Sequence, residues 1–332
     1  MSLTLLPVLS TRSTSAAAVR PNPLESVRSW VPSPVVGTVA VAAASIATAS
    51  ATVFARGLTD AGVAPATVAL SRYGISAVVL LPCLRLTGPK ARATAWGLLA
   101  GAMAGLGWIA YVASIATGDL ALVGVSYMTY PVFTLAVLHF AFRSRATHRA
   151  VVAAVLVLLA AAVALGPSLS AGFSPMFFIA PATFGFGVAV LTERLRELDP
   201  FERLAAVSAG ATLVLAPVVM AEVGISAVPT DLRVVPAILG IGVGCALIPM
   251  TIYGAAAPAI GGARSAMAGA VELPTVFLIG AFVYDEAVRI EHLVAAVIIV
   301  AAISLTPSGR TIHVLAEDDE IGSCAIRHNL RT

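Results

Sequence analysis

Ten apolar stretches fill the sequence between Pro34 and Pro307, and each is about long enough to cross a lipid bilayer as a helix. Hydrophobic residues make up 59% of the chain, charged residues make up 11%, and the mean hydropathy is +0.96. On a soluble protein this composition would expose large apolar patches, whereas helices that face lipid require an apolar surface. The sequence therefore predicts an all-α integral membrane protein with ten transmembrane helices.

The predicted spans follow one another with connections of mostly about 4 to 12 residues, so the chain forms one membrane unit with a tail at each end. The shortest spans, of about 16 residues, rise only about 25 Å, which is the lower limit for crossing the hydrocarbon core. With boundaries good to about three residues, the spans lie at roughly 35–55, 66–84, 96–116, 121–142, 150–166, 174–192, 203–221, 234–254, 265–284 and 291–306.

Basic residues divide unevenly between the two sides of the membrane. If the N-terminus is cytoplasmic, sixteen of the 20 Lys and Arg residues fall inside, three fall outside, and Arg72 lies within a span. The positive-inside rule then predicts that both termini are cytoplasmic, in a plasma membrane such as the bacterial inner membrane. The same asymmetry explains the net charge of +3, so we expect the lipid bilayer and no nucleic acid as a partner.

The two tails and the cysteines suggest no further chemistry. Residues 1–33 hold three arginines and one acid, Glu25, which fits either an organellar transit segment or a plain cytoplasmic tail, and we expect the tail. Residues 308–332 form a second tail with an acidic run. Cys83, Cys245 and Cys324 are far apart and match no metal or disulfide motif, so no cofactor is expected.

The chain repeats itself weakly at an offset of about 140 residues. Pro65–Pro82 and Pro200–Pro217 share prolines at both ends, and Tyr130-Pro131 aligns with Leu273-Pro274. Because five is an odd number, a second copy of a five-helix unit must enter the membrane from the opposite side. The sequence therefore predicts two inverted five-helix repeats, at 34–167 and 173–307, which is an arrangement that permits alternating access.

Several residues carry a resemblance to a known family. These are Arg72 within Ala69–Tyr73, the run Tyr130–Phe133, and Val271–Pro274 followed by Asp285-Glu286. In this layout the halves resemble EamA-like units of the drug/metabolite transporter (DMT) superfamily. The resemblance implies a ten-helix carrier of small metabolites. The first half departs from the family pattern, because Arg143 stands where a glutamate would fall.

Glu272 is the most informative single residue, since it lies about seven residues into the ninth span. An ionised carboxylate there without a partner costs several kcal/mol, so it should face the bundle interior. Three interpretations are open: a substrate or proton site, a structural ion pair or hydrogen bond, and a misplaced span boundary. Arg72, inside the outer end of the second span, either extends to the outer headgroups or clamps a carboxylate or phosphate.

Aromatic and proline residues complete the candidate site. Tyr127 and Tyr130 share one helix face, and Thr129 occupies the repeat position of Glu272. Each either lines a cavity or packs between helices, and the same holds for three weaker candidates, Trp108, Tyr111 and Tyr253. Pro131 and Pro274 should kink their helices at matching sites, which suits a gate or a fixed packing feature.

These features predict a secondary-active carrier, an exporter of small organic metabolites such as amino acids, with protons as the candidate coupling ion. A multidrug or toxic-compound efflux carrier is the alternative. A membrane enzyme or a scaffold is less favoured, because no catalytic motif and no sizeable soluble domain is present. The sequence contains no P-loop, so ATP is not expected as the direct energy source.

Overall fold

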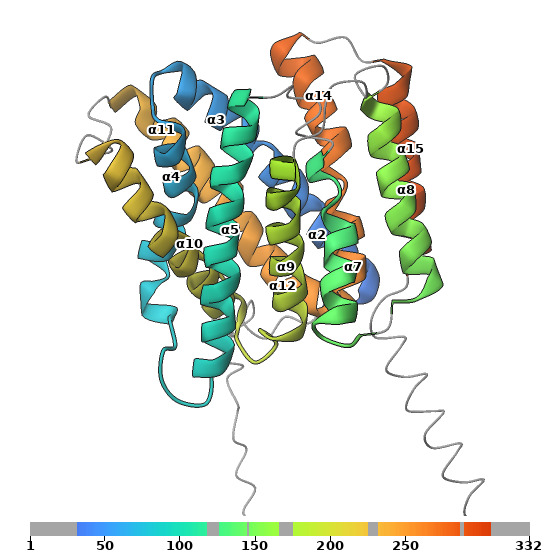
Figure 1. The fold of residues 1–332 in the computed structure, drawn as a ribbon, viewed down its shortest axis with the longest axis horizontal. Helices are drawn as coiled ribbons and strands as arrows, with labels where there is room; N and C mark the ends of the chain where they lie inside the picture. Colours follow the sequence, from blue (N-terminus) through green and yellow to red (C-terminus); the bar gives the residue numbers. More distant parts are fainter. Residues whose placement is uncertain are drawn as a thin grey trace, which may run out of the picture.

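The computed structural model describes residues 32–117, 126–144, 146–165, 175–224, 232–285 and 289–306. Within these ranges all regular structure is helical (Figure 1). Five helical segments are long and apolar enough to cross a membrane, namely Pro34–Asp60, Ala91–Tyr111, Pro200–Glu222, Leu232–Ile260 and Gly262–Val283. Four shorter apolar helices and Pro65–Val79 bring the described segments to ten, in the predicted order.

The helices have the following bounds. The first half contains α2 (Pro34–Ala49), α3 (Ala51–Asp60), α4 (Pro65–Val79), the 3-10 turn η1 (Leu81–Cys83), α5 (Ala91–Thr117), α7 (Tyr130–Phe140) and α8 (His148–Leu165). The second half contains η3 (Pro175–Phe178), α9 (Ile179–Glu193), α10 (Pro200–Glu222), η5 (Leu232–Val234), α11 (Val235–Leu239), the π-helical η6 (Gly240–Leu247), α12 (Ile248–Ile260), α13 (Gly262–Gly269), α14 (Glu272–Tyr284) and α15 (Ile290–Leu305).

Some helices extend beyond the predicted spans. The third begins at Ala91 rather than near residue 96, and the eighth continues to Ile260 rather than ending near residue 254. Hydropathy marks only the part of a helix that lies in hydrocarbon, whereas backbone hydrogen bonding continues into the interface where alanine favours the helix. The beginning of the predicted fourth span, at residues 121–125, falls outside the described residues.

Proline and polar caps set where several helices begin. Proline occupies the first position of α2, α4 and α10, where its missing N–H costs nothing and its fixed φ suits a helix. At α10, the Asp199 carboxylate accepts hydrogen bonds at 3.0 Å from the backbone N–H groups of Phe201 and Glu202, and Glu202 accepts one from the Asp199 N–H. This capping box fixes the start of α10.

Two helices are interrupted at matching places in the two halves. Residues 128–129 form a turn before α7, and residues 270–271 form a turn before α14. Pro131 and Pro274 follow these turns by two or three residues. Because proline cannot donate to the carbonyl four residues earlier, each break falls where the proline weakens the helix. Both breaks lie inside the bundle, where protein rather than lipid surrounds the backbone.

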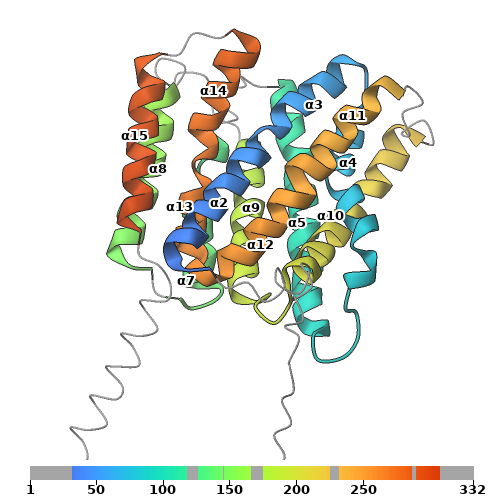
Figure 2. The same ribbon diagram turned by 180° about the vertical axis from the view of Figure 1, so that it is seen from behind.

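The helices pack in related pairs. α5 packs against α9, and the helices at the corresponding places of the other half, α12 and α2, also pack on each other. α4 packs against α10, its counterpart in the second half. α8 and α15 pack on each other and lie side by side at one edge of the bundle in both views (Figures 1 and 2). α2 begins and α15 ends at the lower end of Figure 1, as an even number of crossings requires.

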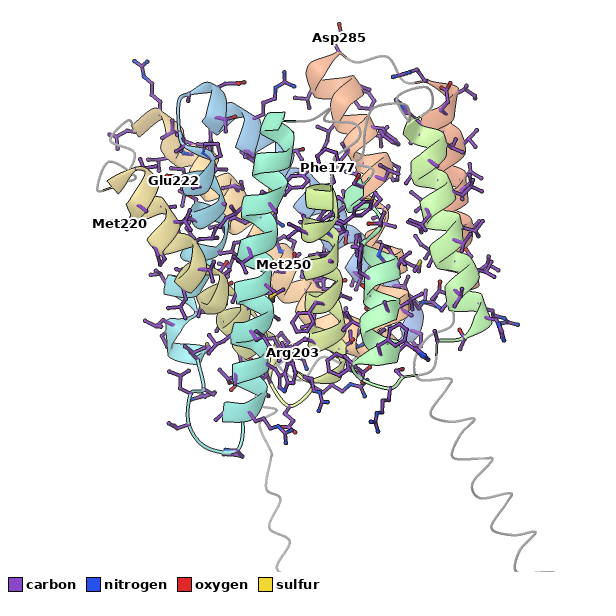
Figure 3. The ribbon with its side chains drawn as sticks, in the orientation of Figure 1. Phe177, Arg203, Met220, Glu222, Met250 and Asp285 are labelled. Atoms are coloured by element: carbon purple, nitrogen blue, oxygen red, sulfur yellow. The ribbon has the colours of Figure 1, made fainter. Side chains whose placement is uncertain are left out.

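The two ends of the bundle differ in charge. Arg203 is labelled near the lower end in Figure 3, whereas Glu222 and Asp285 are labelled toward the upper end. We call the lower end the basic end, because the described connections and helix ends there carry Arg85, Lys90, Arg92, Arg143, Arg149, Arg194, Arg196 and Arg264.

A glycine stripe brings α5 against α10. A Cβ on Gly97 would stand 2.6 Å from the Ala206 Cβ, one on Gly101 would overlap the Val207 carbonyl, and one on Gly105 would lie 3.1 Å from the Ala211 oxygen. These glycines have the GxxxGxxxG spacing, and the stripe that they form permits close helix approach.

We predict that Gly101→Leu lowers the midpoint of thermal unfolding in detergent by several degrees, because its side chain would displace the α10 backbone. Gly187→Ala is the matched control. It lies on α9 with nothing within 4 Å of its Cβ position, and alanine is the better helix former. Equal midpoints for Gly101→Leu and the wild type would contradict the close packing.

Candidate functional site

Arg72 is held inside the bundle. It lies about 10 Å along α4 from Pro65, its residue is 8% exposed, and its guanidinium carbon stands 4.6 Å from the centre of the Trp108 ring. The side chain therefore stacks on an aromatic ring inside the bundle. Within the described residues, no carboxylate lies within 4.0 Å of its nitrogen atoms.

A continuous series of aromatic rings leads away from Arg72. Trp108 and Tyr111 on α5 stand 5.6 Å apart, and Tyr111 and Tyr127 are also 5.6 Å apart, measured between ring centres. Tyr127 lies 5.8 Å from Tyr130, the first residue of α7. We call these four rings, together with Phe184, the aromatic wall. The structure thus brings together four aromatic residues that the sequence singled out.

Phe184 is a member of the wall that sequence reasoning missed. It lies on α9, and its ring centre is 4.9 Å from that of Tyr130 and 5.7 Å from that of Tyr127. Gly185 permits this approach, since a Cβ there would stand 2.9 Å from the Tyr130 carbonyl oxygen. A phenylalanine in an apolar span carries no distinguishing signal, and only the packing of α7 on α9 identifies it.

Glu272 lies at the middle of the membrane-spanning part. It is the first residue of α14, directly after the break, and about ten residues or 15 Å beyond the start of α13. It is 8% exposed, and no described basic residue pairs with its carboxylate. Its charge acts electrostatically on Tyr111, Tyr127 and Arg72. Burial and depth favour a genuine interior acid over a misplaced span boundary.

Tyr130 and Tyr253 are buried tyrosines with different partners. The Tyr130 hydroxyl donates to the Ala266 carbonyl oxygen at 2.8 Å, which joins α7 to α13. The Tyr253 hydroxyl on α12 is buried without a hydrogen-bond partner, as is the Thr48 hydroxyl on α2. Buried hydroxyls normally find a partner, and the hydroxyls of Thr67, Ser76, Ser208 and Thr212 are likewise buried without one among the described residues. Of these residues, Tyr253 is the one that the sequence also singled out.

The Thr129 side chain forms a hydrogen bond within its own turn. Its hydroxyl donates to the Ser126 carbonyl at 2.6 Å, so it helps to hold the break before α7. It therefore does not match Glu272 in chemistry, although both residues lie at the breaks of the two halves. Among the described residues, no group of three His, Cys, Asp or Glu side chains could hold a metal ion.

Three basic residues near the basic end form hydrogen bonds or ion pairs within the protein. The Arg203 guanidinium, 9% exposed, donates to the carbonyl oxygens of Leu195, Arg196 and Gly254. Arg85 and Lys90 donate to Glu202 at 3.2 and 2.6 Å. These contacts tie the connection between α9 and α10 to α12, and the connection before α5 to α10. They close the basic end of the bundle.

Arg264 strengthens this closure. Its Nε atom donates to the Thr38 hydroxyl at 2.7 Å, and its Nη1 atom donates to the Thr306 carbonyl at 2.9 Å. The first turn of α13 is thereby joined to α2 and to the residue after α15. At the same end, a Cβ on Gly262 would stand 2.8 Å from the Thr192 hydroxyl, so α13 and α9 meet closely there.

We predict opposite outcomes for two matched substitutions. Tyr130→Phe removes a made hydrogen bond and should lower the free energy of unfolding by about 1 kcal/mol. Tyr253→Phe removes an unpartnered hydroxyl and should leave stability unchanged or slightly raised. Unfolding in detergent monitored by tryptophan fluorescence compares the two. A Tyr253→Phe protein as destabilised as Tyr130→Phe would show that the Tyr253 hydroxyl is already bound within the protein.

Comparison with known proteins supports the transporter assignment. Residues 35–166 match the sequence model of the EamA-like transporter family. The chain matches none of the curated proteins, whereas 24 chains of solved structures match it. One of them, described as "Crystal structure of protein", has 17% sequence identity and a TM-score of 0.63, over 82% of this chain and 96% of that chain. At this identity the likeness concerns the fold alone. Residues 35–166 are therefore similar to an EamA-like transporter domain, and the rest of the chain shares with the solved structure a fold of packed helices.

Proposed function

We propose that this chain is a secondary carrier that exports a small metabolite bearing both a carboxylate and an ammonium group, such as an amino acid. The observation that carries the proposal is the presence of Arg72 and Glu272, two interior charges of opposite sign that lack ion-pair partners in the described residues. The aromatic wall contacts Arg72 through Trp108 and lies within electrostatic range of Glu272 at Tyr111.

The electrostatics favour a zwitterionic cargo. An isolated charge near the middle of a bilayer is costly, and a bound group of opposite charge offsets that cost. The planar Arg72 guanidinium suits a carboxylate, which it can bind through two hydrogen bonds. Glu272, with the nearby unpartnered Tyr253 hydroxyl, suits an ammonium group. A zwitterion would neutralise both ends of the site at once.

The lining of the site favours cargo with an apolar or aromatic part. Trp108, Tyr111 and Tyr127 offer ring faces and edges, against which an apolar side chain would pack. The sequence contains no glutamine, and its two asparagines, Asn22 and Asn329, lie in the tails. The membrane part therefore lacks the side-chain amides with which a sugar site would commonly bind several hydroxyl groups.

Alternating access would follow from an inverted repeat of residues 34–167 and 173–307. The related helix pairs support this arrangement, because exchanging the halves converts the α5–α9 contact into the α12–α2 contact. The matching breaks before α7 and α14, next to Pro131 and Pro274, support it as well. Discontinuous helices at the midplane commonly form transporter binding sites, and the two breaks would serve as the moving points of a gate.

Multidrug efflux is the second candidate, and the aromatic wall is the observation that favours it. A carrier of lipophilic cations would use Glu272 and the rings but would not require Arg72. The two functions therefore differ in their dependence on Arg72.

We predict that liposomes containing the full chain take up labelled phenylalanine when a proton gradient is imposed. Arg72→Lys should weaken the apparent affinity about tenfold or more, because the bidentate geometry is lost while the charge remains. Glu272→Gln should abolish the response to the gradient, because an amide cannot carry a proton. The matched controls are Arg92→Lys and Glu222→Gln, which alter exposed residues at the two ends of the bundle.

Three outcomes separate the interpretations. Phenylalanine flux that Arg72→Lys and Glu272→Gln leave unchanged would exclude the zwitterion site. Uptake of tetraphenylphosphonium that needs Glu272 but not Arg72 would favour efflux of lipophilic cations. Flux that persists in Glu272→Gln but no longer follows the gradient would place proton coupling at this carboxyl group.

We further predict that the basic end faces the cytoplasm of a plasma membrane. In a background without the native cysteines, Asp285→Cys should react with a membrane-impermeant maleimide on intact cells. Glu197→Cys, which is exposed at the basic end, should react only after permeabilisation. The reverse pattern would invert the orientation derived from the positive-inside rule.

A further inference from the structure

A groove runs along the outer surface of the bundle between α7 and α8. Its volume is about 630 Å³, and its lining includes no residue of the aromatic wall. Exposed apolar side chains open it toward the surrounding lipid, among them Val132 and Val155. Nine residues line it, eight of them Val, Leu or Ala: Val132, Leu135, Ala136, His139, Ala146, Val151, Ala154, Val155 and Leu158.

The groove follows from the way the two helices pack. α7 packs mainly on α9, whereas α8 packs mainly on α15 at the edge of the bundle (Figures 1 and 2). The two helices therefore diverge after the connection that joins them. From His139 to Val132 the groove follows α7 for about 10 Å at 1.5 Å per residue. This is about two thirds of the hydrocarbon depth of one leaflet, taking the core as about 30 Å thick.

The mouth of the groove is basic. His139 lines its end, Arg143 follows one turn later, and His148 and Arg149 begin α8 at the same end. Arg143 is exposed with a φ of 53°, and the turn is fixed because the Ser144 N–H donates to the Leu138 carbonyl at 2.9 Å.

Within the described ranges, no acid forms an ion pair with Arg143, His148 or Arg149. The sequence holds no Asp or Glu from residue 120 to residue 192, so the basic groups at the mouth have no acidic neighbour in the chain on either side. Among the described residues, the ion pairs near the basic end involve Glu193 and Glu202, which already bind Arg196 and the pair of Arg85 and Lys90.

We propose that this groove is a binding site for an anionic phospholipid of the leaflet at the basic end. One acyl chain lies between α7 and α8, and the phosphate lies among Arg143, His148 and Arg149. The apolar lining fits a hydrocarbon chain, and the basic side chains at the mouth select a headgroup with net negative charge over a zwitterionic one. The proposal is independent of the transport site, which lies inside the bundle.

The test is native mass spectrometry of the purified full chain with added phosphatidylglycerol or phosphatidylcholine of identical acyl chains. The wild type should bind phosphatidylglycerol more tightly. Each of Arg143→Ala and Arg149→Ala should reduce this preference about fivefold, which corresponds to about 1 kcal/mol per basic residue near the membrane surface. Arg92→Ala, at the basic end but on α5, should leave the preference unchanged.

A second pair of variants tests the groove itself. Val155→Trp should fill the groove and weaken the binding of both lipids, while the ratio between them persists. Val152→Trp, on the same helix and similarly exposed but outside the lining, should have no effect. If Arg92→Ala and Arg143→Ala reduced the preference for phosphatidylglycerol equally, the preference would be a general charge effect, and the proposed site would be overturned. Equal binding by Val155→Trp and Val152→Trp would overturn the groove as the acyl-chain position.

Discussion

The absence of water from the hydrocarbon core is the constraint on which this structure depends. Every backbone polar group within the core must be satisfied by the protein, so the described chain crosses as helices and opens its backbone only inside the bundle. The breaks before α7 and α14 obey this rule. Glu272 follows one of these breaks, so irregular backbone lies beside the candidate site, and the π-helical η6 is a further departure from the α-helix.

The buried charged residues fall into two groups that differ in their partners. Arg203 and Glu202 are satisfied by carbonyl groups and by Arg85 and Lys90, and they hold the basic end closed. Arg72 has an aromatic ring beneath it instead of a counter-ion, and Glu272 has no basic partner among the described residues. This contrast is the basis on which we propose a cargo-binding role for Arg72 and Glu272, and burial alone would not supply it.

Helix packing separates a tight centre from a looser edge. The glycine stripe of α5 brings α10 within backbone contact, whereas α8 and α15 pack on each other beside the main bundle. Trp108 and Tyr111 of the candidate site lie on α5, which carries this close contact, and the groove lies between α7 and α8.

The sequence by itself determined that lipid surrounds this protein, and it determined the number and order of the helices and the position of the glycine stripe. These features follow from hydropathy and residue size, which act locally along the chain. It also identified Arg72, Glu272 and the tyrosines as unusual, since polar groups are costly in hydrocarbon. Only the tertiary structure decided that Arg72 stacks on Trp108, that Phe184 completes the aromatic wall, that Thr129 bonds within its own turn, and that Arg203 is fully paired. These facts depend on contacts between helices far apart in sequence, which no local pattern records.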